Sequence, residues 1–484
     1  MKNNTFPFLL RLAFLWGLPH LVVAQTVTVS QPVVLRDETS YEIFSDDRGN
    51  VLLFRNRVSE FKVQGFDANM RLSWEKEVEL DRRSPVIEGV VQGDGGGFNL
   101  IYQFRQKMLP VLKIHRYSPA ANLVDSVTIK RFDQAFFTPS FEVAFSEDKN
   151  MALIWYIREQ TEINALAFDM RQMKLLWEKT FAPEDMVLHR DFLQAIVDND
   201  GNMYFILNKD NSSGRRREHF LEILDFGPGT DSVLRRYTVP MKDYLTYDVK
   251  FAYDNLHRAL KAGGLYSLDN PTKSEGFYFL SIDQARPDTN LLRFYPFDDD
   301  FMAVLNEREK IKKKGIPEAT VQKIVMRTDG GFILIGEINK EFQRGATNPN
   351  MYGRTGFRPV IDYYYNDVFL ISMHPDGNVH WKNILHKKQY SQDDSGMYSS
   401  FFLAKTPTAL RFVYNDEIKS ENTVSEYVVR GTGEFDRNAV LSTQRKELQL
   451  RFRDAVQVSA YDFVVPSERR NRLKLVRISF KGEK

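Results

Sequence analysis

A short turn built on aspartate and glycine recurs along the chain at a nearly constant spacing. The copy at Asp329-Gly330-Gly331 precedes an apolar run, and glycine there supplies the positive φ that tight hairpin turns require. Five of the seven intervals between the turns fall within 48–55 residues, and such a repeat constrains the fold more than any local feature. Strong copies lie at 47–50, 94–97, 148–150, 200–202 and 329–331, and weaker ones at 254–255, 406–408 and 460–462.

Each repeat has the length of four antiparallel strands with their turns. Residues 321–385 hold four apolar, strand-like segments joined by turns and one long loop. Four-stranded units at this spacing are typical of the blades of a β-propeller. The sequence therefore predicts an all-β fold, a single propeller of about eight four-stranded blades over residues 25–484. Seven blades are the alternative.

The two ends of the repeat region are expected to meet. The strand at 26–30 has no hairpin partner nearby, and the last blade, 454–480, contains only three clear strands. Pairing the two would leave no free sheet edge. The N-terminal strand is therefore predicted to close the ring.

Residues 1–24 have the features of a secretory signal peptide. Lys2 and Arg11 flank a short polar start, and the apolar run that follows has about 13 residues, too few to span a bilayer of roughly 30 Å. The mature chain is expected to begin near Gln25, and no later run is long enough for a transmembrane helix, so no direct transmembrane anchor is expected. We expect an exported protein, in the periplasm or at the cell surface of a Gram-negative bacterium.

Composition and motifs exclude several classes of chemistry. Without the signal peptide the basic residues fall by two to 64, equal to the 64 acidic ones, so nucleic acid is not an expected partner. The chain has no cysteine, which excludes disulfides, thiolate metal sites and a lipidated cysteine. It also lacks the His-Glu-x-x-His motif and the nucleophile elbow. No catalytic residue, metal site or cofactor is predicted.

Three predicted fourth strands carry a tryptophan at the same position. These residues are Trp74, Trp177 and Trp381, and each follows a turn or bend that contains aspartate. A large aromatic side chain repeated at one position of layered sheets is expected to pack between neighbouring blades.

One of these repeats resembles a known family. Residues 165–179 comprise a strand, Asp169, a turn and Leu-Trp-Glu-Lys, and they resemble the tryptophan-docking repeat of quinoprotein-like eight-bladed propellers, although the usual turn glycine is replaced around Gln172 and Met173. Residues 367–382 similarly resemble repeats of secreted Bacteroidota propellers. The resemblance implies the ring fold. It does not imply quinone chemistry, because the vicinal cysteines that such enzymes often use are missing.

Two insertions interrupt the repeat. The first, 298–315, opens with acidic residues and ends in lysines before Gly315, a charge order that a helix dipole favours. It is predicted to be a helix packed on the rim of the ring through Phe301, Val304, Leu305 and Ile311.

The second insertion, 339–366, is predicted to be a long loop inside the sixth blade. Arginine and tyrosine are the residues most enriched at binding hot spots, and long loops in compact folds are usually functional or disordered. We predict a partner-contact surface here, with a loop folded over its own blade as the alternative. The candidate binding residues are Arg344, Tyr352, Arg354, Phe357, Arg358, Tyr363, Tyr364 and Tyr365.

Three classes of function remain open. The first is a non-catalytic propeller that scaffolds another envelope protein or a surface glycan. As a scaffolding propeller without a cofactor, the chain would resemble the eight-bladed lipoprotein of the outer-membrane β-barrel assembly machinery. It lacks the lipid-bearing cysteine of that protein. The second is a carbohydrate-active or lyase propeller with carboxylates from different blades in a central channel. The third, a quinoprotein dehydrogenase, is disfavoured by the missing cysteines.

Overall fold

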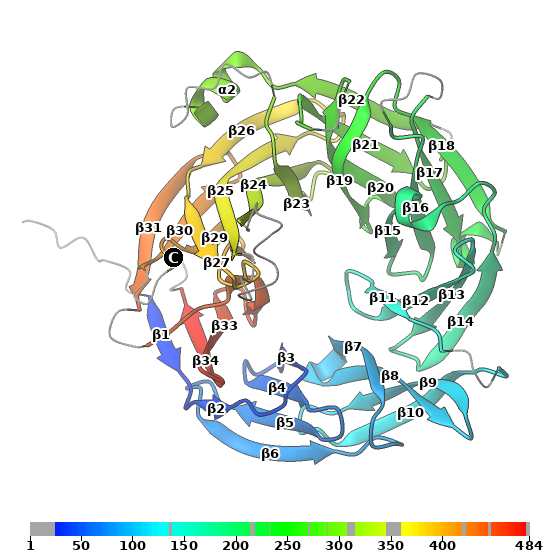
Figure 1. Ribbon diagram of the computed structural model, residues 1–484, viewed down its shortest axis with the longest axis vertical. Coiled ribbons are helices and arrows are strands. Elements are labelled where there is room, and N and C mark those ends of the chain that lie inside the picture. The colour runs from blue at the N-terminus through cyan, green and yellow to red at the C-terminus, as the bar shows by residue number, and fades with distance from the viewer. Residues whose placement is uncertain are drawn as a thin grey trace, which may run out of the picture.

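Eight antiparallel sheets stand side by side around a central axis (Figure 1). The chain is therefore an eight-bladed β-propeller, as predicted, and the seven-bladed alternative is wrong. The predicted signal peptide, 1–24, lies outside the described residues. The computed structural model describes residues 25–134, 138–212, 218–231, 233–269, 272–287, 289–306, 315–344, 360–418, 423–443 and 447–480.

The first four blades each contain four consecutive strands, with the first strand nearest the axis. Blade 1 contains β3 (Ser40–Ser45), β4 (Val51–Asn56), β5 (Phe61–Phe66) and β6 (Leu72–Val78); blade 2, β7 (Val86–Gln92), β8 (Phe98–Gln106), β9 (Leu109–Tyr117) and β10 (Leu123–Arg131); blade 3, β11 (Glu142–Phe145), β12 (Met151–Arg158), β13 (Glu162–Asp169) and β14 (Lys174–Phe181); blade 4, β15 (Phe192–Val197), β16 (Met203–Lys209), β17 (Phe220–Phe226) and β18 (Arg235–Pro240).

The next four blades include the two that depart from this plan, blades 6 and 8. Blade 5 contains β19 (Leu245–Asp254), β20 (Ala259–Ser267), β21 (Gly276–Asp283) and β22 (Asn290–Pro296); blade 6, β23 (Ala319–Met326), β24 (Phe332–Arg344), β25 (Val360–Met373) and β26 (Val379–Leu385), with β27 (Gln389–Gln392) added; blade 7, β28 (Phe402–Lys405), β29 (Ala409–Asn415), β30 (Thr423–Arg430) and β31 (Phe435–Ser442); blade 8, β32 (Val456–Gln457), β33 (Asp462–Arg469) and β34 (Arg472–Ser479), with β1 (Thr26–Val29) and β2 (Val33–Val34). In the described part of the chain, two short α-helices, α1 (Leu188–Asp191) and α2 (Asp299–Asn306), lie between blades.

The recurrent turns owe their shape to an aspartate side chain as well as to glycine. In blade 1, Asp46 Oδ1 accepts hydrogen bonds from the backbone N–H groups of Arg48 (2.9 Å) and Asn50 (2.8 Å), and Gly49 has a φ of +75°. A non-glycine residue at this φ would be strained. The repeat seen in the sequence is therefore a repeated hydrogen-bonding device.

The hydrophobic core consists of layers between adjacent blades. Among the described residues, eight clusters of buried apolar side chains occur, one at each blade-to-blade interface. The cluster between blades 8 and 1 is the smallest, with nine buried residues against ten to sixteen elsewhere. The interface where the ring closes thus buries the fewest apolar side chains among the described residues.

Two of the repeated tryptophans bridge neighbouring blades. The indole of Trp177 in blade 3 donates a hydrogen bond to the carbonyl of Gly201 in blade 4 (2.8 Å), and Trp381 in blade 6 donates to Gly431 in blade 7 (3.0 Å). Trp74 lies over Gly65 on the adjacent strand, where a Cβ would come within 2.3 Å of its ring. The indole N–H of Trp177 and that of Trp381 are each satisfied by the next blade.

The N-terminal strand closes the ring, as predicted. β1 pairs antiparallel with β34 and forms the outermost strand of blade 8, and β2 pairs further along the same strand (Figure 1). Ser30 secures the junction, because its N–H donates to the Leu475 carbonyl and its hydroxyl accepts from the Leu475 N–H, both at 2.9 Å. The chain then crosses through residues 35–39 to β3 at the inner side of blade 1.

Helix α2 occupies the start of the first insertion. Asp298 Oδ1 accepts a hydrogen bond from the Phe301 N–H (2.9 Å), and Phe301 is buried, as the amphipathic pattern predicted. Val304, which was predicted to pack on the rim, is 45% exposed, because the helix contacts the ring through a narrower stripe. Residues 307–314, including Ile311, lie outside the described residues. No helix in the described part of the chain is both long and apolar enough to cross a bilayer.

Candidate functional site

The hairpin of blade 6 extends well beyond the blade. β24 and β25 bend at a register shift between Glu337 and Asn339, and beyond it β25 gains a second neighbour, β27. The predicted loop, 339–366, is therefore strand at both described ends, because β24 and β25 continue to pair with each other and β27 pairs with β25. In Figure 1 this extension lies on the side of blades 6 and 7 that faces the axis.

One face of the extension carries exposed apolar and aromatic side chains, and we call it the hairpin platform. Strand pairing places Phe342 opposite Asp362 and Lys340 opposite Tyr364. Residues directly opposite each other share a face of the sheet. Phe342 is 49% exposed and Tyr390 is 43% exposed, so apolar and aromatic surface faces solvent. The platform comprises Lys340, Phe342, Arg344, Asp362, Tyr364, Tyr390 and Gln392.

Asp362 organises the platform. It forms an ion pair with Arg344, and its Oδ1 accepts hydrogen bonds from the Tyr390 hydroxyl (2.8 Å) and from Gln392 Nε2 (2.9 Å). The hydrogen bond from Arg344, which outweighs the effect of burial, lowers the pKa of Asp362 to about 2. The same carboxylate raises the pKa of Tyr390 through its hydrogen bond. Arg and Tyr are thus held in fixed positions by one central anion.

The opposite face packs on the propeller. Tyr363 is only 8% exposed, and the ring of Tyr365 lies under the guanidinium of Arg453, 4.5 Å from its centroid. Beneath it, the Lys387 ammonium forms a buried ion pair with Glu337 at 2.6 Å, and burial lowers the pKa of Lys387.

Of the eight predicted binding residues, the structure therefore separates two groups. Arg344 and Tyr364 lie on the hairpin platform, whereas Tyr363 and Tyr365 face inward. The others, Tyr352, Arg354, Phe357 and Arg358, lie outside the described residues. Phe342 and Tyr390 were not predicted, because residues 340–344 contain a single apolar residue and show no alternation that would indicate a strand face.

A cavity of about 990 Å³ lies between blades 8 and 1, and we call it the closure cavity. It is bordered by the crossing segment 35–39, the start of β3, the short helix at Phe452–Asp454 and the β33–β34 hairpin. Twelve of its sixteen lining residues are polar or charged. It exists because β32, the inner strand of blade 8, has only two residues and leaves the interface open.

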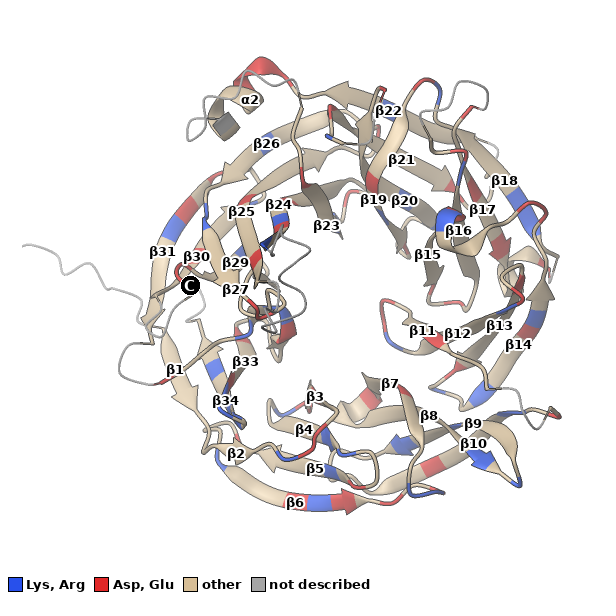
Figure 2. Ribbon diagram, viewed as in Figure 1, with Lys and Arg blue, Asp and Glu red and all other residues tan. Residues whose placement is uncertain are grey.

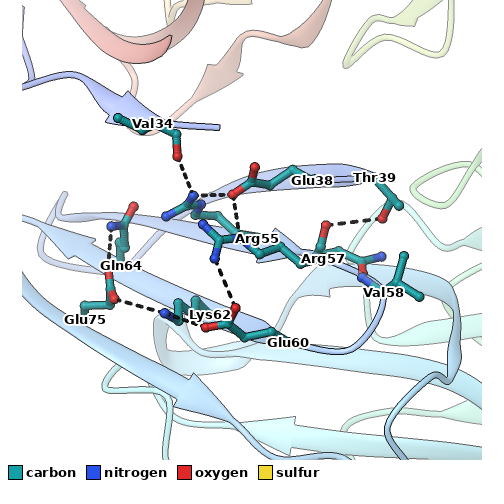
Figure 3. A network of polar contacts seen from close by, with 11 residues as sticks. Val34, Glu38, Thr39, Arg55, Arg57, Val58, Glu60, Lys62, Gln64 and Glu75 are labelled. Carbon is teal, nitrogen blue, oxygen red and sulfur yellow. Dashed lines mark hydrogen bonds and ion pairs between the residues drawn. The ribbon is translucent and has the colours of Figure 1, made fainter. Parts of the chain in front are cut away.

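A polar network fixes one wall of the closure cavity (Figure 3). The Glu38 carboxylate pairs with Arg55 and with Arg57 Nε (2.9 Å), and Arg55 also donates to the Val34 carbonyl at 2.8 Å. Burial opposes ionisation, but the hydrogen bonds from Arg57 and Arg55 outweigh it and lower the pKa of Glu38. The Glu38 side chain is 4% exposed, so this is a buried ion pair that holds the crossing segment against blade 1.

The other wall is organised by Arg451. Its guanidinium pairs with Glu468 and with Asp454, both at 2.5 Å, and lies 5.8 Å from the centroid of the Tyr41 ring. The Tyr41 hydroxyl is buried with no hydrogen-bond partner among the described residues, and burial raises its pKa. Glu42 has no ion pair in the described chain, and its pKa is raised by burial and by nearby Asp454.

Carboxylates also occur on the inner strands of other blades. Glu88 on β7 accepts a hydrogen bond from Gln103 (2.6 Å), and Glu142 lies on β11 of the next blade. Burial, opposed by that hydrogen bond and reinforced by Glu142, raises the pKa of Glu88 to about 7. A carboxyl group with this pKa can exchange protons near neutral pH.

Charge and metal-ligand geometry give no further site. Acidic and basic residues are both scattered over the strands of the ring (Figure 2). Within the described ranges, no three His, Asp or Glu side chains converge as metal ligands.

The residues of the closure cavity were not predicted from the sequence. Tyr41 and Glu42 stand some 400 positions from Arg451 and Asp454, and no motif links them. Closure of the ring by the N-terminal strand was the one signal that could have brought these segments together.

Among known proteins, similarity is found to solved structures alone. No protein-family model matches the chain, and no curated protein matches it in sequence. Among solved structures, it is similar to the polysaccharide lyase Uly1, with 9% identity, a TM-score of 0.40 and coverage of 94% of this chain and 99% of that one. It is also similar to the Dos1 propeller (8% identity, TM-score 0.41, coverage 95% and 96%).

A further similarity is to dipeptidyl peptidase 4 of Porphyromonas gingivalis, with 11% identity and a TM-score of 0.44. The alignment covers 91% of this chain but 59% of that one. No family or activity is assigned to the chain from these similarities.

Proposed function

We propose that the protein is an exported, non-catalytic β-propeller that binds another envelope protein through the hairpin platform. The observation that carries this proposal is the outward face around Asp362, where Phe342, Tyr390 and Arg344 are exposed yet held by strand pairing and hydrogen bonds. Aromatic and arginine side chains that are rigid before binding lose little entropy in a complex.

A matched pair of substitutions tests the proposal. Wild-type protein, Phe342→Ser and Phe435→Ser serve as baits in a pull-down from the native envelope. Phe435 is 40% exposed on the outermost strand of blade 7, so its loss removes a similar apolar area elsewhere. We expect Phe342→Ser to reduce capture of the main partner at least tenfold, since hot-spot residues contribute about 2 kcal/mol or more. Full capture by Phe342→Ser, or equal loss with Phe435→Ser, would contradict the proposal.

The second candidate function is a carbohydrate-active propeller. It is favoured by one observation, the inner-strand carboxyl of Glu88 with a pKa of about 7 beside Glu142 of the next blade. A general acid with this pKa could protonate a leaving group near neutral pH. Glycan-degradation assays on wild type and Glu88→Gln test it: glycan breakdown by the wild type that is lost in Glu88→Gln would favour this candidate over the scaffold.

A further inference from the structure

The extension of blade 6 has a free sheet edge along the end of β24. Its neighbour within the blade, β23, pairs with it only as far as Ile338. Before β23 the chain turns away toward blade 5, where Ile316 and Ser274 exchange backbone hydrogen bonds of 2.7 and 2.8 Å. Beyond Asn339, the strand neighbour of β24 among the described residues is therefore β25 alone.

The backbone groups that face this edge belong to Glu341 and Gln343. The N–H of Asn339 donates to the Glu318 carbonyl at 2.9 Å, on the side away from β25. In an antiparallel pair the backbone groups of successive residues face opposite edges of the strand, so residues 341 and 343 face the same way as Asn339. Past Glu318, no strand of the described chain continues on that side.

The opposite strand leads to the same assignment. Ile361 of β25 lies directly opposite Gln343, yet its N–H donates to Asp393 Oδ1 (2.9 Å) and its carbonyl accepts from the Asp393 N–H (3.0 Å). Within the described ranges, no group bonds to the N–H or the carbonyl of Glu341 or Gln343, and both residues are exposed. An open edge of this kind is a template for one more strand.

The side chains beside the edge indicate the chemistry of the added strand. Lys340, Phe342 and Arg344 occupy alternate positions and share the platform face. The two basic side chains are 44% and 52% exposed, and each has one carboxylate partner, Glu318 or Asp362. Opposite charges and apolar pairs directly across two strands stabilise their pairing. The edge therefore fits a strand with an apolar residue opposite Phe342 and acidic residues two positions to either side.

A second copy of the chain fits this edge poorly. Self-pairing centred on Phe342 would place Lys340 directly opposite Arg344, and self-pairing centred on Glu341 would place two carboxylates opposite each other. Like charges directly opposite destabilise a strand pair. Self-pairing centred on Gln343 would use only that residue of the described edge. The edge thus favours a different chain.

We propose that the free edge of β24 accepts an extended segment of the partner protein as an added strand, in which an apolar residue is flanked at alternate positions by acidic ones. This inference rests on the proposed function and specifies how the partner is held. Backbone hydrogen bonds to residues 341 and 343 provide affinity, and the side chains around Phe342 provide selectivity.

A synthetic peptide tests the edge directly. The probe is Thr-Glu-Thr-Phe-Thr-Glu-Thr with blocked ends, titrated calorimetrically into the mature chain. One comparison peptide has lysine in place of both glutamates, and the other has N-methyl groups on the two threonines that flank phenylalanine. We expect the acidic peptide to bind with a dissociation constant on the order of 1 mM. Each comparison peptide should bind about fivefold more weakly or less, because it repels the basic side chains or lacks the edge N–H groups.

Two substitutions of one residue isolate the backbone contact. Gln343→Pro removes the edge N–H, and proline is tolerated on an edge strand where the N–H faces solvent. Gln343→Ala removes the same side chain but keeps the N–H. We expect the proline variant to bind the acidic peptide about fivefold more weakly than the alanine variant, with both melting close to the wild type. A much lower melting temperature for Gln343→Pro would show that the edge is already paired within the chain, and would overturn the proposal.

Hydrogen exchange resolved to single amides is the second measurement. The N–H groups of Glu341 and Gln343 should exchange rapidly in the mature chain and become protected by the acidic peptide, whereas that of Phe342, which faces β25, should be protected throughout. Absence of saturable binding, equal binding of the N-methylated peptide, or unchanged exchange at both edge residues would each overturn the proposal. So would sedimentation that shows a dimer lost in Gln343→Pro, because the edge would then hold a second copy.

The pull-down separates this inference from the proposed function. Loss of partner capture in Phe342→Ser with full capture by Gln343→Pro would leave the platform as the binding surface and overturn the added strand. Full capture by Phe342→Ser with loss in Gln343→Pro would contradict the platform and support the added strand.

Discussion

The hairpin platform and the closure cavity both arise where the chain departs from the four-stranded blade, yet they bury their charges to different extents. On the platform, Asp362 is 2% exposed, but the arginine that pairs with it is 52% exposed. In the cavity wall, Glu38 and Arg55 are 4% and 5% exposed. An extension beyond the sheet is covered on one face only, whereas a join between two blades has sheets on both sides.

Because of this difference, the two regions contribute differently to the stability of the fold and to contacts with a partner. A partly exposed ion pair stabilises the fold little and is available for contacts with a partner. A buried pair contributes strongly to folding, since removal of one member leaves the other charge buried without a partner. The platform should therefore tolerate substitutions that the closure region does not.

The largest expected effect is that of removing the closing strands. A chain lacking residues 25–34 loses β1 and β2, exposes the edge of β34 and breaks the link between blades 8 and 1. We expect a loss of at least about 5 kcal/mol, comparable to the whole stability of many domains, seen as loss of a cooperative melting transition.

The matching change at the platform replaces residues 343–361 with a short Gly-Ser turn. It should shift the melting temperature by no more than a few degrees, because Tyr363 and Tyr365, which pack inward, are retained. Equal melting of the two altered chains would show that closure does not stabilise the ring.

A single substitution in the cavity wall should have the next largest effect. Glu38→Ala leaves Arg55 buried without its carboxylate partner, and breaking a buried pair typically costs about 3–5 kcal/mol. Asp362→Ala, which frees the half-exposed Arg344, should lower the melting temperature much less. Thermal denaturation of the two variants side by side measures the difference. A larger effect for Asp362→Ala would reverse the comparison.

The ring and its closure could be predicted because their determinants are local and repeated. Turn aspartates and glycines mark most of the blades, and the unpaired strand at 26–30 matches the missing fourth strand of blade 8. The platform was predicted only in part. Composition pointed to 339–366, but the side that each residue faces depends on pairing with β27, which joins β25 from 24 or more residues away in sequence.

The closure cavity could not be predicted because no local pattern encodes it. It depends on the shortness of β32 and on contacts between residues at opposite ends of the chain. Polar residues such as Tyr41 and Arg451 have no periodic neighbours that would distinguish them from ordinary surface positions.

Arg453 connects the two regions, and its removal should have a modest effect. It lines the closure cavity and covers the Tyr365 ring at 4.5 Å. Arg453→Ala should reduce stability by about 0.5–1 kcal/mol, the usual range for an exposed cation–π contact. In a double-mutant cycle with Tyr365→Leu, urea denaturation should show a coupling of the same size. Additive effects would show that the inward face of the blade 6 extension and the cavity wall are energetically independent.

The smallest effects concern pH, and here the two regions should respond in opposite directions. The pKa of Asp362 is lowered from 3.8 to about 2 in the folded state, so its contribution is complete above pH 4 and is lost as the pH falls towards 2. The pKa of Glu42 is raised above 4.5, so the folded state holds its proton longer than the unfolded chain does, and stability falls as the pH rises from 4.5.

Each carboxylate can be isolated by comparing the wild type with its own amide variant. The stability difference between wild type and Asp362→Asn should shrink on acidification from pH 4 to pH 2, because only the wild type loses an ionised partner for Arg344. The stability of the wild type relative to Glu42→Gln should fall between pH 4.5 and 8. Only the wild type must ionise a carboxyl beside Asp454. Chemical denaturation across pH 2–8 measures both. Parallel pH profiles for the two pairs would mean that Glu42 ionises as freely as an exposed carboxylate, and that the cavity is open enough for water to solvate it.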